Sequence, residues 1–229
     1  MKIFLDTANV NEIKSCLDNY EIDGVTTNPS IITKENLDFV TLMNEISSIL
    51  GDAKTLFIQV IATDYNGIVE DTKTIFNSIN GNISVKIPVT REGFKAMKYL
   101  SRNGYSVAAT SIITSQQGLM AAKCGAKFLI PYVNRIDNIM GDGVNVVKEL
   151  MDIITMYGYN TEVIAASFKN VQQIHNCALN GVNGVTTSTE LLEKILEHSL
   201  TNWSVEQFTK DWSYANNNED SIAKTIKKV

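Results

Sequence analysis

The sequence predicts an α/β fold, a (β/α)8 TIM barrel with a C-terminal helical tail. Apolar runs of strand length occur eight times, and a segment with apolar residues at helical spacing follows each run. The chain has 229 residues, a length in keeping with eight such units. An open doubly wound sheet is the structural alternative, but the glycine-rich turn expected after its first strand is missing from the sequence.

The predicted strands are short apolar runs bounded by turn residues. They span residues 2–6, 24–28, 55–61, 83–89, 106–112, 127–134, 162–168 and 181–187. The predicted helices span residues 10–20, 38–50, 66–79, 91–100, 115–125, 143–158, 171–181 and 190–200. Glycines stand near helix ends, where a left-handed residue closes the last turn; they are Gly51, Gly104, Gly125, Gly158 and Gly181.

The predicted strand at residues 83–89 carries a lysine at its centre. Branched residues occupy its odd positions, so a period of two places them on one face and Lys86 on the other. A helix that Thr90 can cap follows at once, so the branched face would contact this helix and Lys86 would point into the barrel. A lysine is rarely buried without a partner or a function. The structural alternative is an internal salt bridge to Asp6.

The chain continues past the eighth predicted helix. Apolar and aromatic residues recur there at helical spacing, and they are Trp203, Val205, Phe208, Trp212 and Tyr214. Residues 216–220 then form a polar break before a last short helix. We expect a barrel over residues 1–201 and a helical extension over residues 202–229. Its aromatic stripe would pack either on its own barrel or on a neighbouring subunit.

Polar side chains stand at the predicted carboxyl ends of the strands, where barrels of this kind hold their reacting groups. They are Asp6, Thr26, Asn28, Gln59, Lys86, Thr110, Tyr132, Arg135 and Ser167. Any one of them could be a turn or cap residue, but their convergence around one lysine indicates a site. Burial lowers the pKa of a lysine, and the neutral amine attacks carbonyl carbon. Lys169 is a second candidate, which we expect in a loop.

The composition argues against several other functions. The net charge of −5 disfavours nucleic acid or an anionic membrane as the main partner. No apolar run approaches the about 18 residues that span a bilayer. The three cysteines and two histidines have no zinc-ligand spacing, and no glycine-rich phosphate loop occurs. We expect reduced thiols, a cytoplasmic location and no metal or other cofactor.

The chain resembles the small-subunit transaldolase family, which includes fructose-6-phosphate aldolase, in the motifs FLDTANVNEI, GVTTNPSII, VKIPVT, PYVNRID, AASFKN and FTKDW. The likeness runs over nearly the whole chain. It implies a (β/α)8 barrel that acts on a sugar phosphate through a covalent Schiff base, without a metal. It also implies a ring-based homo-oligomer, a decamer or a pentamer.

The resemblance also implies roles for residues in the matching motifs. Lys86 of VKIPVT would be the Schiff-base lysine, and Asp6 of FLDT would be the carboxylate beside it. The TTNPS turn would contribute substrate contacts from Thr26, Thr27, Asn28 and Ser30. Arg135 of NRID and Ser167 of AASF would hold the substrate phosphate, and a helix beginning after Ser167 would add backbone donors.

Two positions bear on the branch of the family. Transaldolases of the family resemble one another in a glutamate and a phenylalanine where this chain has Gln59 and Tyr132, as in the aldolase branch. A glutamine can hold a water molecule, and a phenol can donate and accept a proton. The structural alternative for Tyr132 is a core aromatic residue with a tethered hydroxyl.

We therefore expect a class I aldolase that cleaves or forms fructose 6-phosphate from dihydroxyacetone and glyceraldehyde 3-phosphate. The alternative is a transaldolase that transfers a dihydroxyacetone unit between sugar phosphates of the pentose phosphate pathway. The sequence is also compatible with a Schiff-base enzyme for a different carbonyl compound, and with a barrel that binds sugar phosphates without catalysis. The donor stays open, because Ile130 is bulky beside the expected site, although Ala108 makes room, and residues 185–192 are more polar than the family pattern.

Overall fold

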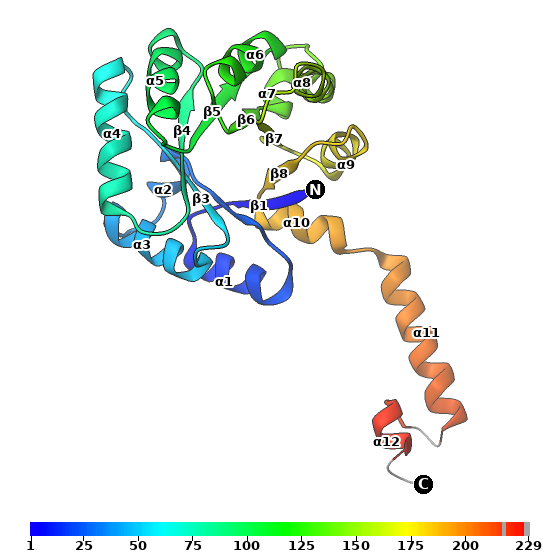
Figure 1. Ribbon diagram of the computed structural model, residues 1–229. Helices are drawn as coiled ribbons and strands as arrows, with labels where there is room; N and C mark the ends of the chain where they lie inside the picture. The colour runs from blue at the N-terminus through cyan, green and yellow to red at the C-terminus, as the bar shows by residue number, and fades with distance from the viewer. Residues whose placement is uncertain (217–218, 227–229) are drawn as a thin grey trace. The chain divides into compact units, whose positions relative to one another are not determined.

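The structure is a computed structural model that describes residues 1–216 and 219–226. Within this part of the chain, eight parallel strands close into one barrel in which β1 pairs with β8 (Figure 1). The strands are β1 (Lys2–Asp6), β2 (Gly24–Thr26), β3 (Thr55–Gln59), β4 (Ile83–Pro88), β5 (Val107–Ile112), β6 (Phe128–Pro131), β7 (Glu162–Ala165) and β8 (Gly184–Thr187). The predicted (β/α)8 barrel is confirmed, and the closure excludes an open sheet.

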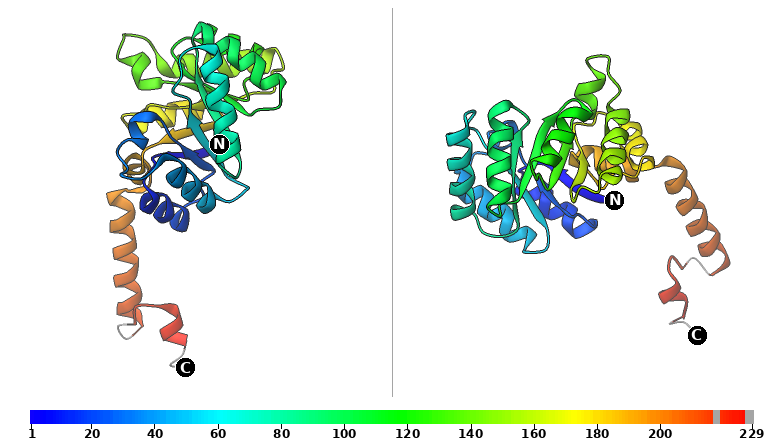
Figure 2. Two further views of the ribbon diagram at one scale, coloured as in Figure 1. Left: turned by 90° about the vertical axis from the view of Figure 1, so that its left-hand side faces the viewer. Right: turned by 45° about the horizontal axis from the view of Figure 1, so that its top comes forward.

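Helices follow the strands and surround them on the outside (Figure 2). They are α1 (Val10–Asn19), α2 (Pro29–Ile32), α3 (Phe39–Leu50), α4 (Tyr65–Ser78), α5 (Arg91–Arg102), α6 (Ser115–Lys123), α7 (Val133–Asp137), α8 (Gly143–Met156), α9 (Val171–Leu179) and α10 (Thr189–Leu196). The short helices α2 and α7 were not predicted. Helix α7 begins inside the predicted strand at residues 127–134, and α2 begins directly after the predicted strand at residues 24–28. Both β2 and β6 end earlier than predicted, because the residues before these helices act as their caps.

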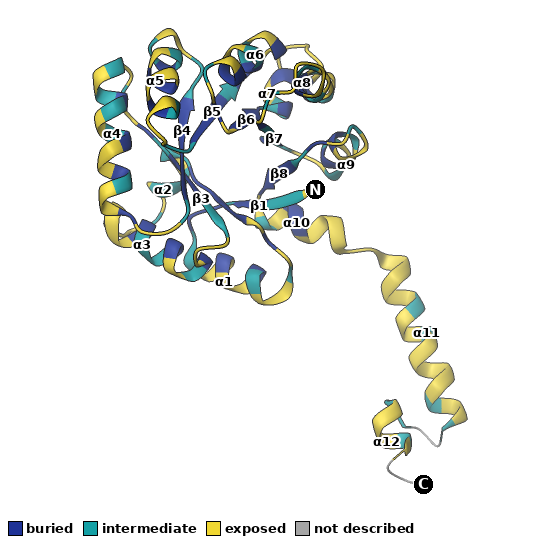
Figure 3. Ribbon diagram, in the orientation of Figure 1, coloured by how far each residue is buried: buried dark blue, intermediate teal, exposed yellow. Residues whose placement is uncertain are grey.

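The strands are buried on both faces (Figure 3). The branched residues of β4, Ile83, Val85 and Ile87, lie on the face toward the helices and are at most 4% exposed. Helix α5 approaches the end of this strand closely, because a Cβ atom added at Gly93 would lie 2.0 Å from the carbonyl oxygen of Pro88. The βα turn that follows Lys86 therefore has little freedom to move.

A layer of apolar side chains fills the barrel interior and reaches the strand ends at Ala166, which follows β7. Its members are Phe4, Phe57, Ala108, Phe128, Ile130, Ile164 and Ala166, and Tyr132 packs against them. The ring of Phe57 contacts those of Phe4 and Phe128 edge to face, with centroid distances of 5.4 and 5.0 Å. This layer removes water from one side of any group that lies at the strand ends.

The chain divides into two compact units, residues 1–191 and 192–229. The second unit contains α11 (Ser199–Ala215) and α12 (Ile222–Ile226). The aromatic stripe lies on α11, where Trp203 and Phe208 are 59% and 70% exposed. Residues 217–218 of the predicted polar break and residues 227–229 of the predicted extension lie outside the described residues.

Candidate active site

The carboxyl ends of the strands enclose a cavity of about 110 Å³ around Lys86. Side chains from β1, β4 and β8 line it together with residues that follow β2, β6 and β7. The lining residues are Asp6, Asn28, Lys86, Tyr132, Arg135, Ala166, Ser167 and Thr186. The structure thus brings together six of the residues that the sequence singled out.

Lys86 is 3% exposed, and its Nζ atom donates a hydrogen bond to the backbone carbonyl oxygen of Thr27 at 2.7 Å. Among the described residues it forms no ion pair with Asp6 within 4.0 Å, so the structural alternative of an internal salt bridge is not observed. Burial lowers the pKa of Lys86 below its ordinary value. Tyr132 and Asp6 oppose this effect, and Arg135 adds to it. The amine is therefore more easily neutral than an exposed lysine would be.

Asp6 is held by a hydroxyl group rather than by a cation. Its Oδ1 atom accepts a hydrogen bond from Thr26 Oγ1 at 2.8 Å, and Thr26 Oγ1 lies 2.6 Å from Thr186 Oγ1. Register supports this arrangement, because Asp6 pairs with Thr26 across β1 and β2. Thr27 has a different position from the one expected. Its hydroxyl donates to the Phe57 carbonyl oxygen at 2.9 Å, so it holds the backbone that contacts Lys86.

Tyr132 lies at the N-terminus of α7 and presents its hydroxyl to the interior. The Tyr132 hydroxyl oxygen lies 3.0 Å from Thr110 Oγ1, and Thr110 is fully buried. The Arg135 guanidinium lies over the Tyr132 ring, 4.5 Å from its centroid. The phenol is thus held between a buried hydroxyl and an exposed cation, beside the amine of Lys86.

Ser167 also lines the cavity, and its backbone φ of 63° is unusual for a residue other than glycine. The helix predicted over residues 171–181 is present, but it begins four residues after Ser167. Helix α9 begins at Val171, and the side chain of Asn170 caps it. The chain first turns through the left-handed Ser167 and a short loop, in which Lys169 is exposed and does not line the Lys86 cavity.

The TTNPS turn forms the short helix α2. Asn28 is its N-cap, since Asn28 Oδ1 accepts a hydrogen bond from the Ile31 amide at 3.1 Å, and Asn28 lines the Lys86 cavity. Ser30 lies on the exposed side of α2 and is not among the residues that line this cavity. The structure therefore places Asn28, but not Ser30, beside Lys86.

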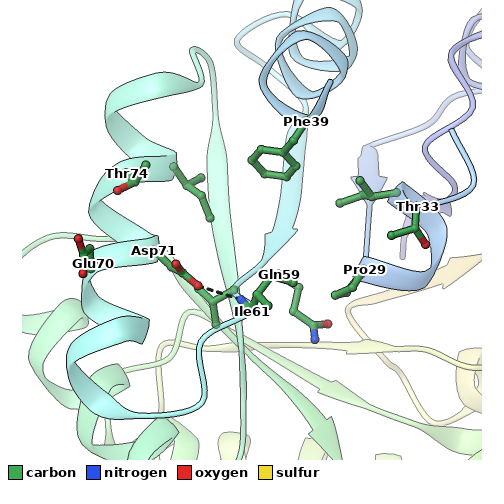
Figure 4. Close-up of a pocket in the computed structure, with 11 residues that line it drawn as sticks. Pro29, Thr33, Phe39, Gln59, Ile61, Glu70, Asp71 and Thr74 are labelled. Atoms are coloured by element: carbon green, nitrogen blue, oxygen red, sulfur yellow. Dashed lines mark hydrogen bonds between the residues drawn. The ribbon is translucent and has the colours of Figure 1, made fainter. Parts of the chain in front are cut away.

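Gln59 is the neighbour of Lys86 across β3 and β4, but it lines another cavity. This second cavity has a volume of about 400 Å³, and its wall includes Gln59, Pro29 and Phe39 (Figure 4). Gln59 Oε1 is buried and has no hydrogen-bond partner in the described part of the chain. Asp71 holds the loop after β3, because its carboxylate accepts hydrogen bonds from two successive backbone amides at 2.9 Å.

Sequence reasoning missed Thr186, which is 3% exposed and lines the Lys86 cavity. The signal is present in the segment GVTT, where Thr186 shares the inward parity of Gly184. From the sequence, the polarity of this segment was related only to the choice of donor substrate. Alternation along the strand would have identified Thr186 as the hydroxyl that faces the interior.

The remaining reactive groups lie away from this cavity. Cys16, Cys124 and Cys177 form no disulfide bond in the described part of the chain. Burial, with smaller effects from Asp137 and Asp142, raises the pKa of Cys177 to about 12. Among the described residues, no three His, Cys, Asp or Glu side chains are grouped so that they could hold a metal ion. Across the same residues, every helix is too short or too polar to cross a membrane.

Comparison with known proteins gives a family and a fold. The family model for transaldolase/fructose-6-phosphate aldolase matches residues 3–228. A probable transaldolase of Methanococcus vannielii is 41% identical over 212 residues, which cover 93% of this chain and 97% of the relative. A probable transaldolase of Desulforapulum autotrophicum is 40% identical over 217 residues, or 95% of this chain and 100% of the relative.

A solved structure, inosine 5′-monophosphate dehydrogenase from Legionella pneumophila, superposes with a TM-score of 0.57 at 10% identity. The match covers 83% of this chain and 58% of that one. At this identity the likeness shows the barrel fold alone.

Proposed function

The chain belongs to the transaldolase/fructose-6-phosphate aldolase family, and from this premise we propose that it breaks and forms a carbon–carbon bond of a phosphorylated ketose through a Schiff base on Lys86. One observation carries the proposal. A lysine that is 3% exposed, with a lowered pKa, shares a cavity with a carboxylate, a phenol and an arginine. These are the groups that amine catalysis of a sugar phosphate requires.

The first step joins the amine to the ketone. The neutral Nζ of Lys86 attacks the carbonyl carbon, and the oxygen takes up a proton to give a carbinolamine. Loss of this oxygen as water leaves a protonated iminium ion. The apolar surroundings of Lys86 favour the neutral amine before attack. Asp6 and Tyr132 line the same cavity and are groups that can move protons.

The second step breaks the bond between C3 and C4. A base takes the proton of the C4 hydroxyl, the C4 oxygen becomes a carbonyl, and the bonding electron pair moves toward the iminium nitrogen. An aldehyde phosphate leaves, and the enamine of dihydroxyacetone stays on Lys86. We assign the base to Asp6, because its carboxylate lines the same cavity and Thr26 holds it in place at 2.8 Å.

Arg135 and Ser167 are the proposed phosphate contacts. Arg135 is exposed, and its guanidinium can turn its donors toward an anion that enters the cavity. The Lys86 cavity of about 110 Å³ is too small for a complete sugar phosphate, so the phosphate would lie toward the solvent beside Arg135.

The fate of the enamine distinguishes an aldolase from a transaldolase. Release requires a proton at C3 and then water at the iminium carbon. We propose release, and hence fructose-6-phosphate aldolase activity, because the Tyr132 hydroxyl is paired with Thr110 and can pass a proton through a bound water. Gln59 stands on the neighbouring strand, but its side chain lines the second cavity, so the proposal of release rests on Tyr132 and Thr110.

Transfer is the second candidate, and the names of the relatives favour it. Proteins about 40% identical to this chain are named probable transaldolases. A transaldolase would keep the enamine until an aldose phosphate such as erythrose 4-phosphate arrives. The chemistry at Lys86, Asp6 and Arg135 would be the same in both cases.

The experiment is to incubate the purified chain with fructose 6-phosphate and to measure glyceraldehyde 3-phosphate, with and without erythrose 4-phosphate. An aldolase produces it without an acceptor, and a transaldolase requires the acceptor for turnover. A barrel that only binds sugar phosphates produces none and gives no borohydride-stable adduct. A Schiff-base enzyme for another carbonyl compound gives an adduct with different ketones or aldehydes.

We also propose that the active form is a homo-oligomer. The exposed stripe on α11, with Trp203, Phe208 and Trp212, supports this assembly, since aromatic side chains are enriched at interfaces. A ring of five or ten subunits is the form that the family resemblance implies.

A further inference from the structure

Two buried threonines and a carboxylate form a chain of hydrogen bonds inside the barrel. Thr186 lies on β8 and Thr26 on β2, and these two strands flank β1, which carries Asp6. The two hydroxyl oxygens are 2.6 Å apart, and Thr26 Oγ1 is 2.8 Å from Asp6 Oδ1. Thr26 is fully buried and Thr186 is 3% exposed.

The number of protons fixes the direction of this chain. An ionised carboxylate can only accept, so the single hydroxyl proton of Thr26 is donated to Asp6. Thr26 then has no proton left for its second contact, and the bond of 2.6 Å requires Thr186 to be the donor. The order is therefore Thr186 to Thr26 to Asp6. Each donor strengthens the next hydrogen bond, because polarisation is cooperative in a buried chain.

We propose that Thr186 is a positioning residue for the reaction on Lys86, acting through Thr26 to hold the Asp6 carboxylate as an acceptor facing the substrate. This inference rests on the proposed function, since it gives Asp6 the C4 hydroxyl proton in the cleavage step. Thr186 fixes the rotation of the Thr26 hydroxyl. Without it, Thr26 keeps an unpaired oxygen in a place that its burial closes to water.

The contact is specific to the hydroxyl of Thr186, and β8 supplies a matched control. Thr187 is the next residue on the strand and is also 3% exposed. Thr187 Oγ1 has no hydrogen-bond partner in the described part of the chain. Thr187→Val therefore removes a buried hydroxyl from the same strand without breaking a hydrogen bond.

The test compares Thr186→Val, Thr186→Ser and Thr187→Val in the cleavage of fructose 6-phosphate by the full chain. Valine keeps the shape of threonine and removes the donor, whereas serine keeps the donor and removes the methyl group. We expect Thr186→Val to lower kcat roughly tenfold, the usual effect of one lost buried hydrogen bond, with KM little changed. Thr186→Ser and Thr187→Val should stay within about twofold of the unmodified chain.

A purely packing role predicts the opposite order, with serine impaired and valine active, and that result would overturn the proposal. The serine variant also decides the matter if the valine variant does not fold. Loss of activity in a folded Thr186→Ser chain would then show that Thr186 acts through the packing of its methyl group, and would contradict the proposal.

A double substitution tests whether Thr186 acts through Asp6. In a chain that already carries Asp6→Asn, Thr186→Val should lower kcat little further, because the acceptor at the end of the hydrogen-bond chain has lost its charge. A further tenfold loss would show an independent role and contradict the inference. Failure of the proposed function looks different. The unmodified chain would then form no borohydride-stable adduct on Lys86, whereas failure of this inference alone leaves the adduct and full activity in Thr186→Val.

Discussion

The amine of Lys86 donates to the carbonyl oxygen of Thr27 across 2.7 Å, and this contact orients the side chain without neutralising it. A carboxylate in that place would favour the charged lysine. A neutral carbonyl group can accept from either form, so desolvation determines the protonation state. The surroundings of Lys86 therefore favour its neutral amine. The Asp6 carboxylate is bound to Thr26 instead, where we propose that it accepts the C4 hydroxyl proton.

The first prediction concerns pH. Because burial lowers the pKa of Lys86, its neutral amine should appear below the ordinary lysine value of about 10.4. The rate of adduct formation with dihydroxyacetone, measured with cyanoborohydride, should rise with pH through that lowered pKa and then level off. An inflection at or above the ordinary value would show that the burial has no chemical consequence.

The second prediction concerns stability. The folded-state pKa of Lys86 lies below the unfolded value, so the unfolded chain binds more protons and burial of the lysine destabilises the fold. This cost is complete below the folded-state pKa and disappears as pH rises through the unfolded-state value of about 10.4. Lys86→Met should therefore increase the free energy of unfolding at neutral pH by on the order of 1 kcal/mol, or about 2–4 °C in Tm.

Thermal unfolding checks this value, with Lys169→Met as the control. Lys169 is exposed in a loop, and its replacement should change stability by no more than about 0.5 kcal/mol. The gain from Lys86→Met should also shrink as the pH is raised. A less stable Lys86→Met chain would mean that the contact with Thr27 outweighs the desolvation cost.

The third prediction separates release from transfer. Tyr132→Phe keeps the ring under Arg135 and deletes the hydroxyl that meets Thr110. Release of dihydroxyacetone should fall by about 10²–10⁴-fold, the usual range for lost acid–base help, while trapping on Lys86 persists. Tyr105→Phe is the control, since Tyr105 contacts Phe76 on another part of the barrel.

A second substitution added to Tyr132→Phe tests the alternative, transaldolase activity. Gln59→Glu combined with Tyr132→Phe should raise transfer to erythrose 4-phosphate relative to release. If the unmodified chain already transfers far faster than it releases, the transaldolase assignment replaces the aldolase one. A Tyr132→Phe chain with unchanged release removes Tyr132 from the mechanism.

The fourth prediction concerns assembly. The stripe on α11 should be covered by a neighbouring subunit, so light scattering at micromolar concentration should give a mass several times the 25.3 kDa of one chain. Replacing Trp203 and Phe208 with serine should dissociate the assembly, whereas changing the exposed Tyr157 of the barrel should not. A monomer of the unmodified chain at that concentration would contradict the proposal.

The sequence predicted the barrel and its lysine because both depend on periodicity. Alternation in residues 83–89 determines the face of Lys86, and no tertiary detail is needed for that step. The short helices α2 and α7, of four and five residues, were missed because segments of that length carry no helical period. Their caps, Asn28 and Tyr132, were consequently included in the predicted strands.

Two site residues show where parity stops being informative. Gln59 shares the inward register of Lys86, but a long side chain at a strand end can lean away, and it lines the second cavity. The left-handed backbone of Ser167 could not be predicted, because nothing in the local sequence demands it. The helix at residues 171–181 was predicted, and only the turn that separates it from Ser167 was not.

The central claim is that Lys86 forms the covalent bond to the substrate, and trapping tests it most directly. The chain is incubated with fructose 6-phosphate in the presence of borohydride, digested, and the modified peptide is located by mass spectrometry. We predict a reduced adduct on Lys86. Lys86→Ala should abolish the adduct and lower the cleavage rate by at least ~10³-fold. Lys169→Ala should keep both the adduct and the rate. An adduct on Lys169, or full turnover by Lys86→Ala, would contradict this claim.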